Sequence, residues 1–282
     1  MARRDPSLAL RRVQGDLIVV QVRINRAGPY DFLVDTGSQI TTIDPGLASE
    51  LHLGIDGTTG VSGVATHSRS AFAFLDLIEV GSHSVSQSLA VIQDMAELKE
   101  ADPRIRGILG ENFLAHFDLL IDNLRQILCL DESTTLAQAV KGDHIPLEQP
   151  HGARDDMPFT RPMIVFVRLT TSDVAAALLR LDSGSNAAVL YSVQPRLLRA
   201  SLSLAPVLKR VVSGVEQAFA VLPAQDLLVG ACPVRHVSFV MPMNGVGSGP
   251  SPREDGLLPT SAFERVFISY SKNYAAFAPW GR

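Results

Sequence analysis

The sequence has few cysteines and no clustered histidines. Its two cysteines, Cys129 and Cys232, cannot form a disulfide framework and do not have the spacing of a metal site. The seven histidines are scattered singly, without a His-Glu-x-x-His motif or a Cys/His cluster. We therefore expect both cysteines to behave as small buried hydrophobic residues, and we predict no metal and no cofactor.

Long apolar runs and concentrated positive charge are also absent. No run of 18 apolar residues occurs, so we expect no membrane-spanning helix. The formal net charge of -4, without a basic patch, argues against nucleic acid or an anionic membrane as the main partner. Residues 1–6 lack the apolar stretch of a signal peptide, which leaves two localisations open: cytoplasmic, or periplasmic or secreted after removal of a leader.

What the chain does contain is enough apolar sequence for a sizeable core. Its 282 residues are 46% hydrophobic and 19% charged, which argues against wholesale disorder. The length suits two domains or two fused lobes of about 100–150 residues each.

The first half of the chain is predicted as short strands around a polar loop. Residues 20–24 alternate between apolar and polar, which is typical of a half-buried strand. The apolar segment 32–34 then leads into Asp35-Thr36-Gly37-Ser38. Asp44 and Pro45 predict the N-cap and first turn of a short helix. The following features are a Gly/Ser/Thr-rich stretch at 57–63, a strand at 71–80, Gly107-Ile108-Leu109-Gly110, and a strand–turn–strand at 121–130.

The second half repeats this order. Residues 165–169 alternate, and the apolar segment 178–181 leads into Asp182-Ser183-Gly184-Ser185. The counterparts of the remaining features are a helix start near Ser192 and Pro195, a flexible stretch at Ser213-Gly214, and Gly256-Leu257-Leu258-Pro259. Two such loops with matched flanks and nearly matched spacing indicate an internal duplication.

The region between the halves, residues 141–158, is rich in proline, glycine and charge and is predicted as a linker. We therefore predict an N-terminal lobe at 15–140 and a C-terminal lobe at 159–282. Many short strands and few long helices indicate a mostly β fold with a pseudo-twofold axis.

An Asp at the end of an apolar strand is held rigidly at the mouth of a core, and the glycine after it permits a tight turn. If two such loops met across a twofold axis, their carboxyl groups would lie within about 3–4 Å and would share one proton, because like charges at that distance do not both ionise. One carboxylate could then activate a water while the protonated one polarises a carbonyl, the pair titrating as a unit.

These two loops resemble the active-site loops of pepsin- and retropepsin-type aspartic peptidases. In that family a hydrophobic-hydrophobic-Gly segment packs behind each loop, and Ile108-Leu109-Gly110 matches this element in the first half. Residues 107–130 also resemble bacterial retropepsin-like sequences, and the similarity extends over roughly residues 15–135 and 160–280. The resemblance implies two pseudo-twofold-related, retropepsin-like (acid protease) β-barrel lobes in one chain, each the size of a retroviral-type subunit.

The resemblance implies that Asp35 and Asp182 form the catalytic pair. Thr36 and Ser183 would brace the two loops through their hydroxyls. Ser38 and Ser185 would donate hydrogen bonds to the carboxylates, which favours the ionised form and an acidic optimum. The protein would be an aspartic-type endopeptidase, a monomer that takes an extended peptide or protein substrate, with no cofactor.

The sequence departs from the family pattern in two places. Pro259 stands where the pattern has glycine, and no tyrosine occurs between Asp35 and Gly110, where pepsin-like flaps carry one. The flap candidates are Gly/Ser-rich, closer to the retroviral type, and are Gly60, Val61, Ser62, Gly63, Ser213, Gly214 and Val215.

Other features invite different interpretations. Residues 245–250 are glycine-rich but lack the lysine and the strand–helix setting of a phosphate loop, so a surface loop is expected. Asp118, Asp122 and Asp131 lack EF-hand spacing and are expected as exposed hairpin carboxylates. The alternative function is a catalytically silent module that binds an extended peptide by β-addition. Retention of both aspartates with both hydroxyl neighbours favours the enzyme, either a general peptidase or a narrow processing one.

Overall fold

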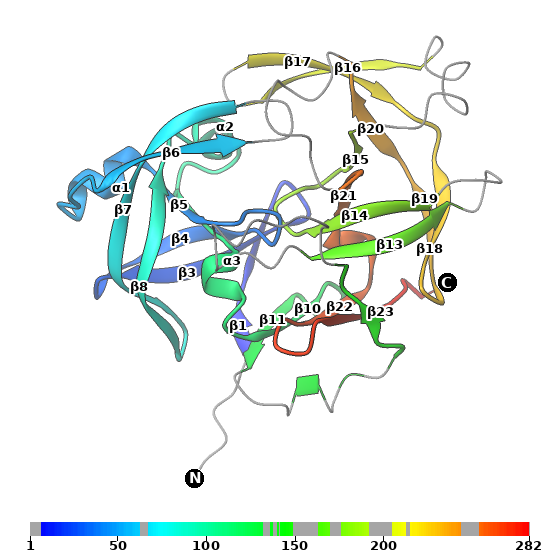
Figure 1. Ribbon diagram of the computed structural model, residues 1–282, viewed down its shortest axis with the longest axis horizontal. Helices are drawn as coiled ribbons and strands as arrows, with labels where there is room; N and C mark the ends of the chain where they lie inside the picture. The colour runs from blue at the N-terminus through cyan, green and yellow to red at the C-terminus, as the bar shows by residue number, and fades with distance from the viewer. Residues whose placement is uncertain are drawn as a thin grey trace.

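The computed structural model describes residues 7–62, 67–131, 136–137, 140, 142–148, 163–169, 176–191, 205–212, 215–243 and 254–281. In these ranges the chain is mostly β, with strands β1 to β23 and four short helical segments (Figure 1). None of the helices in the described part is long and apolar enough to cross a membrane. In the described part of the chain Cys129 and Cys232 form no disulfide; Cys129 is buried, as predicted, and Cys232 is half-buried.

The first half of the chain forms an eight-stranded sheet. Its order is β2 (Arg11–Val13), β3 (Leu17–Ile24), β4 (Ala27–Val34), β9 (Ile105–Leu109), β5 (Thr41–Ile43), β8 (His83–Ile92), β7 (His67–Val80) and β6 (Gly57–Ser62). The predicted alternation appears at the end of β3, where Val22 and Ile24 are buried and Gln21 and Arg23 are exposed.

The second half forms a nine-stranded sheet. Its order is β16 (Val207–Val212), β17 (Val215–Val221), β20 (Phe239–Pro242), β15 (Ala188–Leu190), β21 (Gly256–Pro259), β14 (Ala176–Asp182), β13 (Ile164–Leu169), β18 (Gln225–Val229) and β19 (Cys232–Val237).

Seven strands follow one another in the same spatial order in both sheets. The series β3-β4-β9-β5-β8-β7-β6 corresponds to β13-β14-β21-β15-β20-β17-β16. The parallel pairings fall at the same places, β4 with β9 and β5 with β8 in the first sheet, β14 with β21 and β15 with β20 in the second. The duplication seen in the sequence therefore has a counterpart in strand order and direction.

A third, six-stranded sheet joins the two halves. Its order is β1 (Ser7–Ala9), β11 (Ile127–Asp131), β10 (Asp118–Asp122), β22 (Arg265–Ser269), β23 (Tyr274–Ala278) and β12 (Ile145–Pro146). At its centre β10 pairs antiparallel with β22, a strand from the other half. In Figure 1 this sheet lies at the bottom, opposite the hairpins β6–β7 and β16–β17 at the top.

The structure differs from the predicted linker at residues 145–146. This segment forms β12, which pairs with β23 at the outer edge of the six-stranded sheet. Residues 141 and 149–158 of the predicted linker lie outside the described part. The lobe boundaries at 140 and 159 stay predictions.

Four short helical segments connect strands: α1 (Pro45–Glu50), α2 (Ala96–Ala101), α3 (Glu111–Leu114) and the 3-10 helix η1 (Thr260–Ala262). The start of α1 is confirmed, since the Asp44 carboxylate caps it by accepting a hydrogen bond from Leu47 N–H at 3.0 Å. The counterpart expected near Ser192 and Pro195 lies outside the described residues.

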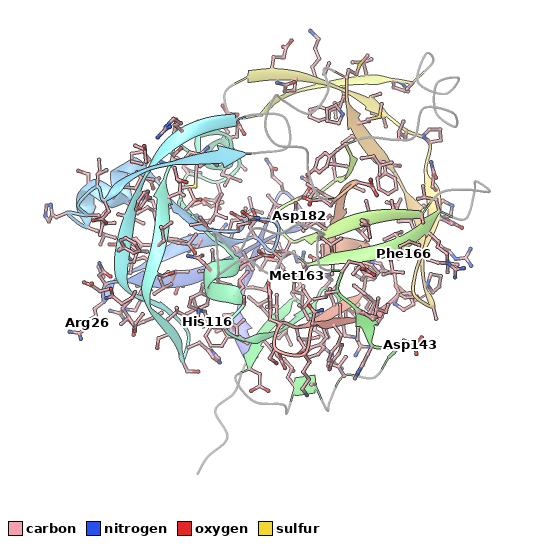
Figure 2. All side chains as sticks on the ribbon, in the orientation of Figure 1. Arg26, His116, Asp143, Met163, Phe166 and Asp182 are labelled. Carbon is pink, nitrogen blue, oxygen red and sulfur yellow. The ribbon has the colours of Figure 1, made fainter. Side chains whose placement is uncertain are left out.

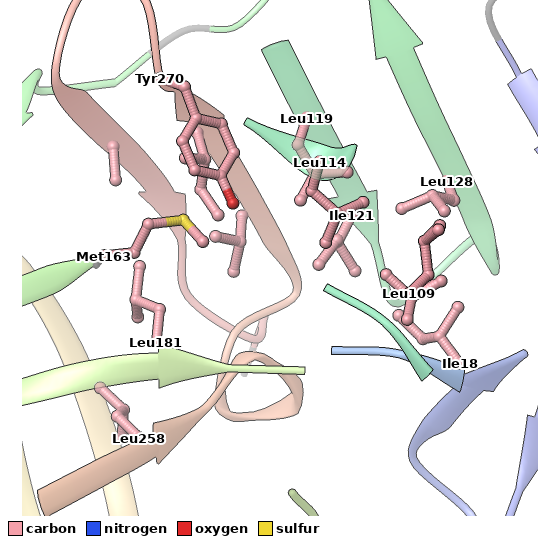
Figure 3. Close-up of a cluster of buried hydrophobic side chains, with 14 of the residues drawn as sticks. Ile18, Leu109, Leu114, Leu119, Ile121, Leu128, Met163, Leu181, Leu258 and Tyr270 are labelled. Atoms are coloured by element: carbon pink, nitrogen blue, oxygen red, sulfur yellow. The ribbon is translucent and has the colours of Figure 1, made fainter. Parts of the chain in front are cut away.

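One hydrophobic core runs through both halves. Leu109 and Leu128 of the first half belong to the same buried cluster as Leu181, Leu258 and Tyr270 of the second (Figure 3). Truncating one of these leucines to alanine would cost about 2–5 kcal/mol. Because this cluster is continuous, the two halves stabilise each other rather than folding around separate cores.

Candidate active site

The two predicted Asp loops begin at equivalent points of the two large sheets. Asp35 follows the last residue of β4, and its N–H donates to the Leu109 carbonyl at 3.0 Å. Asp182 is the last residue of β14 and lies opposite Pro259 of the parallel strand β21. In both cases the neighbouring parallel strand ends beside the aspartate, so the sheet fixes the position of the aspartate backbone.

The segments behind the loops have the predicted packing. Val34 pairs with Leu109 in the first half, as Leu181 pairs with Leu258 in the second. Leu109, Leu257 and Leu258 are buried, and Ile108 is half-buried against a smaller apolar cluster. Pro259 therefore preserves the register that Gly110 has in the first half.

Four buried hydrogen bonds lock the loops together. Thr36 N–H donates to Ser183 Oγ at 3.1 Å, and Ser183 N–H donates to Thr36 Oγ1 at 3.0 Å. The hydroxyls then donate across the interface, from Thr36 to the Leu181 carbonyl at 2.9 Å and from Ser183 to the Val34 carbonyl at 2.7 Å. This places both hydroxyls in the bracing positions that the sequence led us to expect.

The two loop glycines are needed for a close approach rather than for a left-handed turn. A Cβ on Gly37 would lie 2.7 Å from Asp182 Cγ, and a Cβ on Gly184 would lie closer still to Asp35 Cγ. Each glycine thus makes room for the carboxyl group of the opposite loop. A side chain at either position would push the carboxyl groups apart.

Each carboxyl group lies against the glycine of the opposite loop, and each affects the pKa of the other. Asp182 is buried and Asp35 half-buried, with Asp182 near the middle of the molecule in Figure 2. Asp35 Oδ1 accepts from the backbone N–H of Gly37 at 2.8 Å and of Ser38 at 3.1 Å, and Asp182 Oδ1 accepts from Gly184 N–H at 2.7 Å. Backbone donors therefore support both carboxylates.

Burial raises the pKa of both aspartates. For Asp182 the negative charge of Asp35 acts in the same direction, and its pKa lies well above the ordinary value. For Asp35 the amides of Gly37 and Ser38 oppose the effect of burial on the pKa. The pair therefore keeps a proton at pH values where isolated carboxyl groups would have lost it.

The predicted role of the two outer serine hydroxyls is wrong. Ser38 Oγ donates to the Ile40 carbonyl at 3.1 Å, and Ser185 Oγ donates to the Ala187 carbonyl at 2.8 Å. Each hydroxyl closes its own turn two residues ahead, a local bond that serine forms readily. Only the backbone of Ser38 reaches a carboxylate, so serine hydroxyls give no argument for an acidic optimum.

Sequence reasoning missed a charged cluster beside the pair. Arg180, in the apolar strand β14, is buried; its Nη1 donates to the Gly37 carbonyl at 3.1 Å, and its Nε lies 3.1 Å from Glu254 Oε1. Glu111, at the start of α3, is fully buried, and burial raises its pKa to about 8. The available signal was a single arginine among leucines, two positions before Asp182.

The flap candidates fall on two hairpins. Gly60, Val61 and Ser62 end β6, which pairs with β7, and Val215 begins β17, which pairs with β16. Gly63, Ser213 and Gly214 lie outside the described residues. The two hairpins occupy corresponding places in the two sheets. A role as flaps stays a prediction.

The expectation for the three hairpin aspartates is corrected. Asp118 and Asp122 are buried, because β10 lies inside the six-stranded sheet. Their carboxylates accept hydrogen bonds from Ser269 Oγ and Arg125 N–H, and that of Asp131 accepts from Leu136 N–H. In the described ranges no group of acidic, histidine or cysteine side chains is arranged to hold a metal ion. Residues 245–250 lie outside those ranges.

Comparison with known proteins supports the family resemblance. Residues 20–113 match the family described as aspartyl protease, a segment that contains Asp35 and the strands around it. A solved structure, the retropepsin-like aspartic protease from Rickettsia conorii, is 18% identical; the match covers 44% of this chain and 87% of that one, with a TM-score of 0.33. No curated protein matches. The family match supports the resemblance of residues 20–113 to aspartyl proteases.

Proposed function

We propose that this protein is an aspartic endopeptidase in which Asp35 and Asp182 share one proton and activate a water molecule. The observation that carries the proposal is that each carboxyl group lies against the glycine of the opposite loop, and the mutual effect of the two carboxyl groups on their pKa supports it. Such a pair holds a base and an acid side by side at one pH, because like charges in contact do not both ionise.

The surroundings favour Asp182 as the carboxyl that holds the proton. Asp35 accepts two backbone hydrogen bonds and is half-buried, whereas Asp182 accepts one and is buried. In the proposed reaction Asp35 takes a proton from the water as the water oxygen attacks the peptide carbonyl carbon, and Asp182 donates its proton to the carbonyl oxygen. When the tetrahedral intermediate collapses, one of its hydroxyls returns a proton to Asp182, the C–N bond breaks, and the nitrogen receives the proton held by Asp35.

The proposed substrate is an extended peptide lying between two pseudo-twofold-related lobes. The shared strand order of the two large sheets and the corresponding hairpins β6–β7 and β16–β17 support this arrangement. Because both aspartates come from one chain, we propose that the monomer is active.

The test is cleavage of a peptide library at pH 3–8 by the wild type, Asp35→Asn and Asp182→Asn. We expect each substitution to abolish cleavage, and the double variant to be scarcely worse than either, because loss of one carboxyl disables the shared-proton pair. Asn keeps the shape of Asp, so folding, checked by circular dichroism, should persist. Binding of peptides by a folded wild type that cleaves none would instead favour the silent peptide-binding module.

A further inference from the structure

A buried positive charge, that of Arg180 in the second half, lies beside the Asp35–Asp182 pair. Arg180 is 8% exposed, although it sits between Leu179 and Leu181 in β14. Taking a guanidinium out of water is costly unless it is paired and hydrogen-bonded. A leucine would suit a structural role at this point of the strand, as Leu33 does two positions before Asp35.

The contacts of Arg180 cross the interface between the halves. Its Nε forms an ion pair with Glu254 of its own half, while its Nη1 donates to the Gly37 carbonyl of the other half. Gly37 N–H in turn donates to Asp35 Oδ1 at 2.8 Å. The peptide units on the two sides of Gly37 are thus held between Arg180 and the Asp35 carboxylate.

The charged and titratable groups around Arg180 come from several elements. Glu254 precedes β21, Glu111 begins α3, Tyr191 follows β15 and Tyr270 follows β22. Burial raises the pKa of Glu111 to about 8 and that of both tyrosines above the ordinary value. The raised pKa values of Glu111 and the two tyrosines favour their uncharged forms at neutral pH, so Arg180, paired with Glu254, is the positive charge that acts on the two aspartates.

We infer that Arg180, anchored by Glu254, is a positioning residue that fixes the Asp35 loop across the interface and supplies the positive charge against which the two carboxyl groups titrate. The inference rests on the proposed function for its effect on cleavage, and its effect on titration can be measured without any cleavage. Its charge favours the ionised form of both Asp35 and Asp182.

The two partners of the ion pair should shift the titration in opposite directions. Arg180→Met removes the positive charge, so both apparent pKa values of the pair should rise, by about one pH unit or more. Glu254→Gln removes the negative charge that offsets Arg180, so both apparent pKa values of the pair should fall. Matched controls are Arg235→Met and Glu216→Gln, which remove the same charges from exposed side chains of the second half and should shift neither value.

The measurement is a 13C NMR titration of the Asp35 and Asp182 carboxyl carbons, assigned with the two Asn variants. Alongside it, the pH profile of kcat should move upward for Arg180→Met and downward for Glu254→Gln, with kcat about 10–100-fold lower at the optimum of Arg180→Met because the loop is displaced. Arg180→Lys should restore the position of the profile but only part of kcat, since lysine keeps the charge without the planar fork.

Arg180→Met leaves Glu254 unpaired, so the double variant Arg180→Met/Glu254→Gln serves if the single one does not fold. It should titrate near the wild type while kcat stays low, because the net charge is restored and the bond to Gly37 is not. Unchanged titration in folded Arg180→Met, or shifts of the same sign in both single variants, would overturn the inference. If the wild type cleaves no peptide but the two single variants shift the titration in opposite directions, the proposed function is refuted and the positioning role stands.

Discussion

The two Asp loops share their backbone scaffold but are supported by different chemistry. In the first half, Asn112 accepts from Thr41 N–H and Oγ1–H at 2.8 Å each and donates to Ser88 Oγ and the Leu89 carbonyl. Gly110 N–H adds a bond to Thr41 Oγ1 at 3.2 Å. The loop of Asp35 thus rests on a buried polar network.

In the second half the strand pairing places Ala188 and Pro259 where the first half has Thr41 and Gly110. Ala188 has no hydroxyl and Pro259 has no backbone N–H, so neither residue can form the corresponding hydrogen bonds. Charge is found instead at Arg180, whose counterpart Leu33 packs in an apolar cluster. The comparison teaches that a duplicated fold can keep a symmetric pair of carboxyl groups while surrounding them asymmetrically.

The largest effect is expected where the two halves are most alike. Gly37→Ala and Gly184→Ala each place a methyl group against the opposite aspartate. We expect either change to lower kcat/KM by at least about 100-fold, since a displacement of about 1 Å at reacting groups costs that much. Gly54→Ala is the control, because a Cβ there meets no atom within 4 Å. Near-normal cleavage by either loop variant would show that the glycines are not needed for the approach of the carboxyl groups.

A pH-dependent difference is expected at Glu111, whose counterpart in the second half is Thr260. The folded-state pKa of Glu111 is about 8, above the ordinary value of 4.5, so the folded state binds the proton more tightly and the wild type loses stability as pH rises from 4.5 to 8. Glu111→Gln has no such loss. Its free energy of unfolding relative to that of the wild type should therefore rise by up to about 4 kcal/mol between pH 4.5 and pH 8.

Urea unfolding at pH 4.5, 6 and 8 measures this difference, with exposed Glu100→Gln as the control. A difference between wild type and Glu111→Gln that stays constant across these pH values would mean that Glu111 is ionised in the folded protein.

The polar network of the first half predicts a difference between two further equivalent positions. Asn112→Ala leaves Thr41 N–H without its acceptor in a buried site and should lower the free energy of unfolding by about 2–3 kcal/mol. Ser261→Ala, at the corresponding point of the second half, should change it by less than about 0.5 kcal/mol. Chemical denaturation of both variants tests this, and equal losses would contradict the asymmetry.

The smallest effect is expected from making the second half resemble the first. Pro259 has φ of -64°, which suits proline without strain. Pro259→Gly should therefore lower the free energy of unfolding by about 0.4–1 kcal/mol, through the greater freedom of the unfolded chain. Thermal unfolding measures it; a gain in stability would show that proline strains the second loop.

The sequence alone determined the features that depend on neighbouring residues. Apolar segments ending in Asp-Thr-Gly-Ser and Asp-Ser-Gly-Ser indicated two equivalent strand ends, and the repeat of their flanks indicated two similar sheets. Asp44 and Pro45 specified the start of α1, because capping is a contact within one turn. These signals are local, so they are present before the chain folds.

Only the tertiary structure decided what lies opposite each residue. The sequence pattern predicted the wrong hydrogen-bond partners for the hydroxyls of Ser38 and Ser185, because a hydroxyl that can reach a carboxylate can also close its own turn. Asp118 and Asp122 were predicted to be exposed but are buried, since β22 from the far end of the chain pairs with β10. Arg180 gained its place beside Asp35 through a contact between residues 143 positions apart. Contacts across such separations depend on how the sheets meet, which no local pattern specifies.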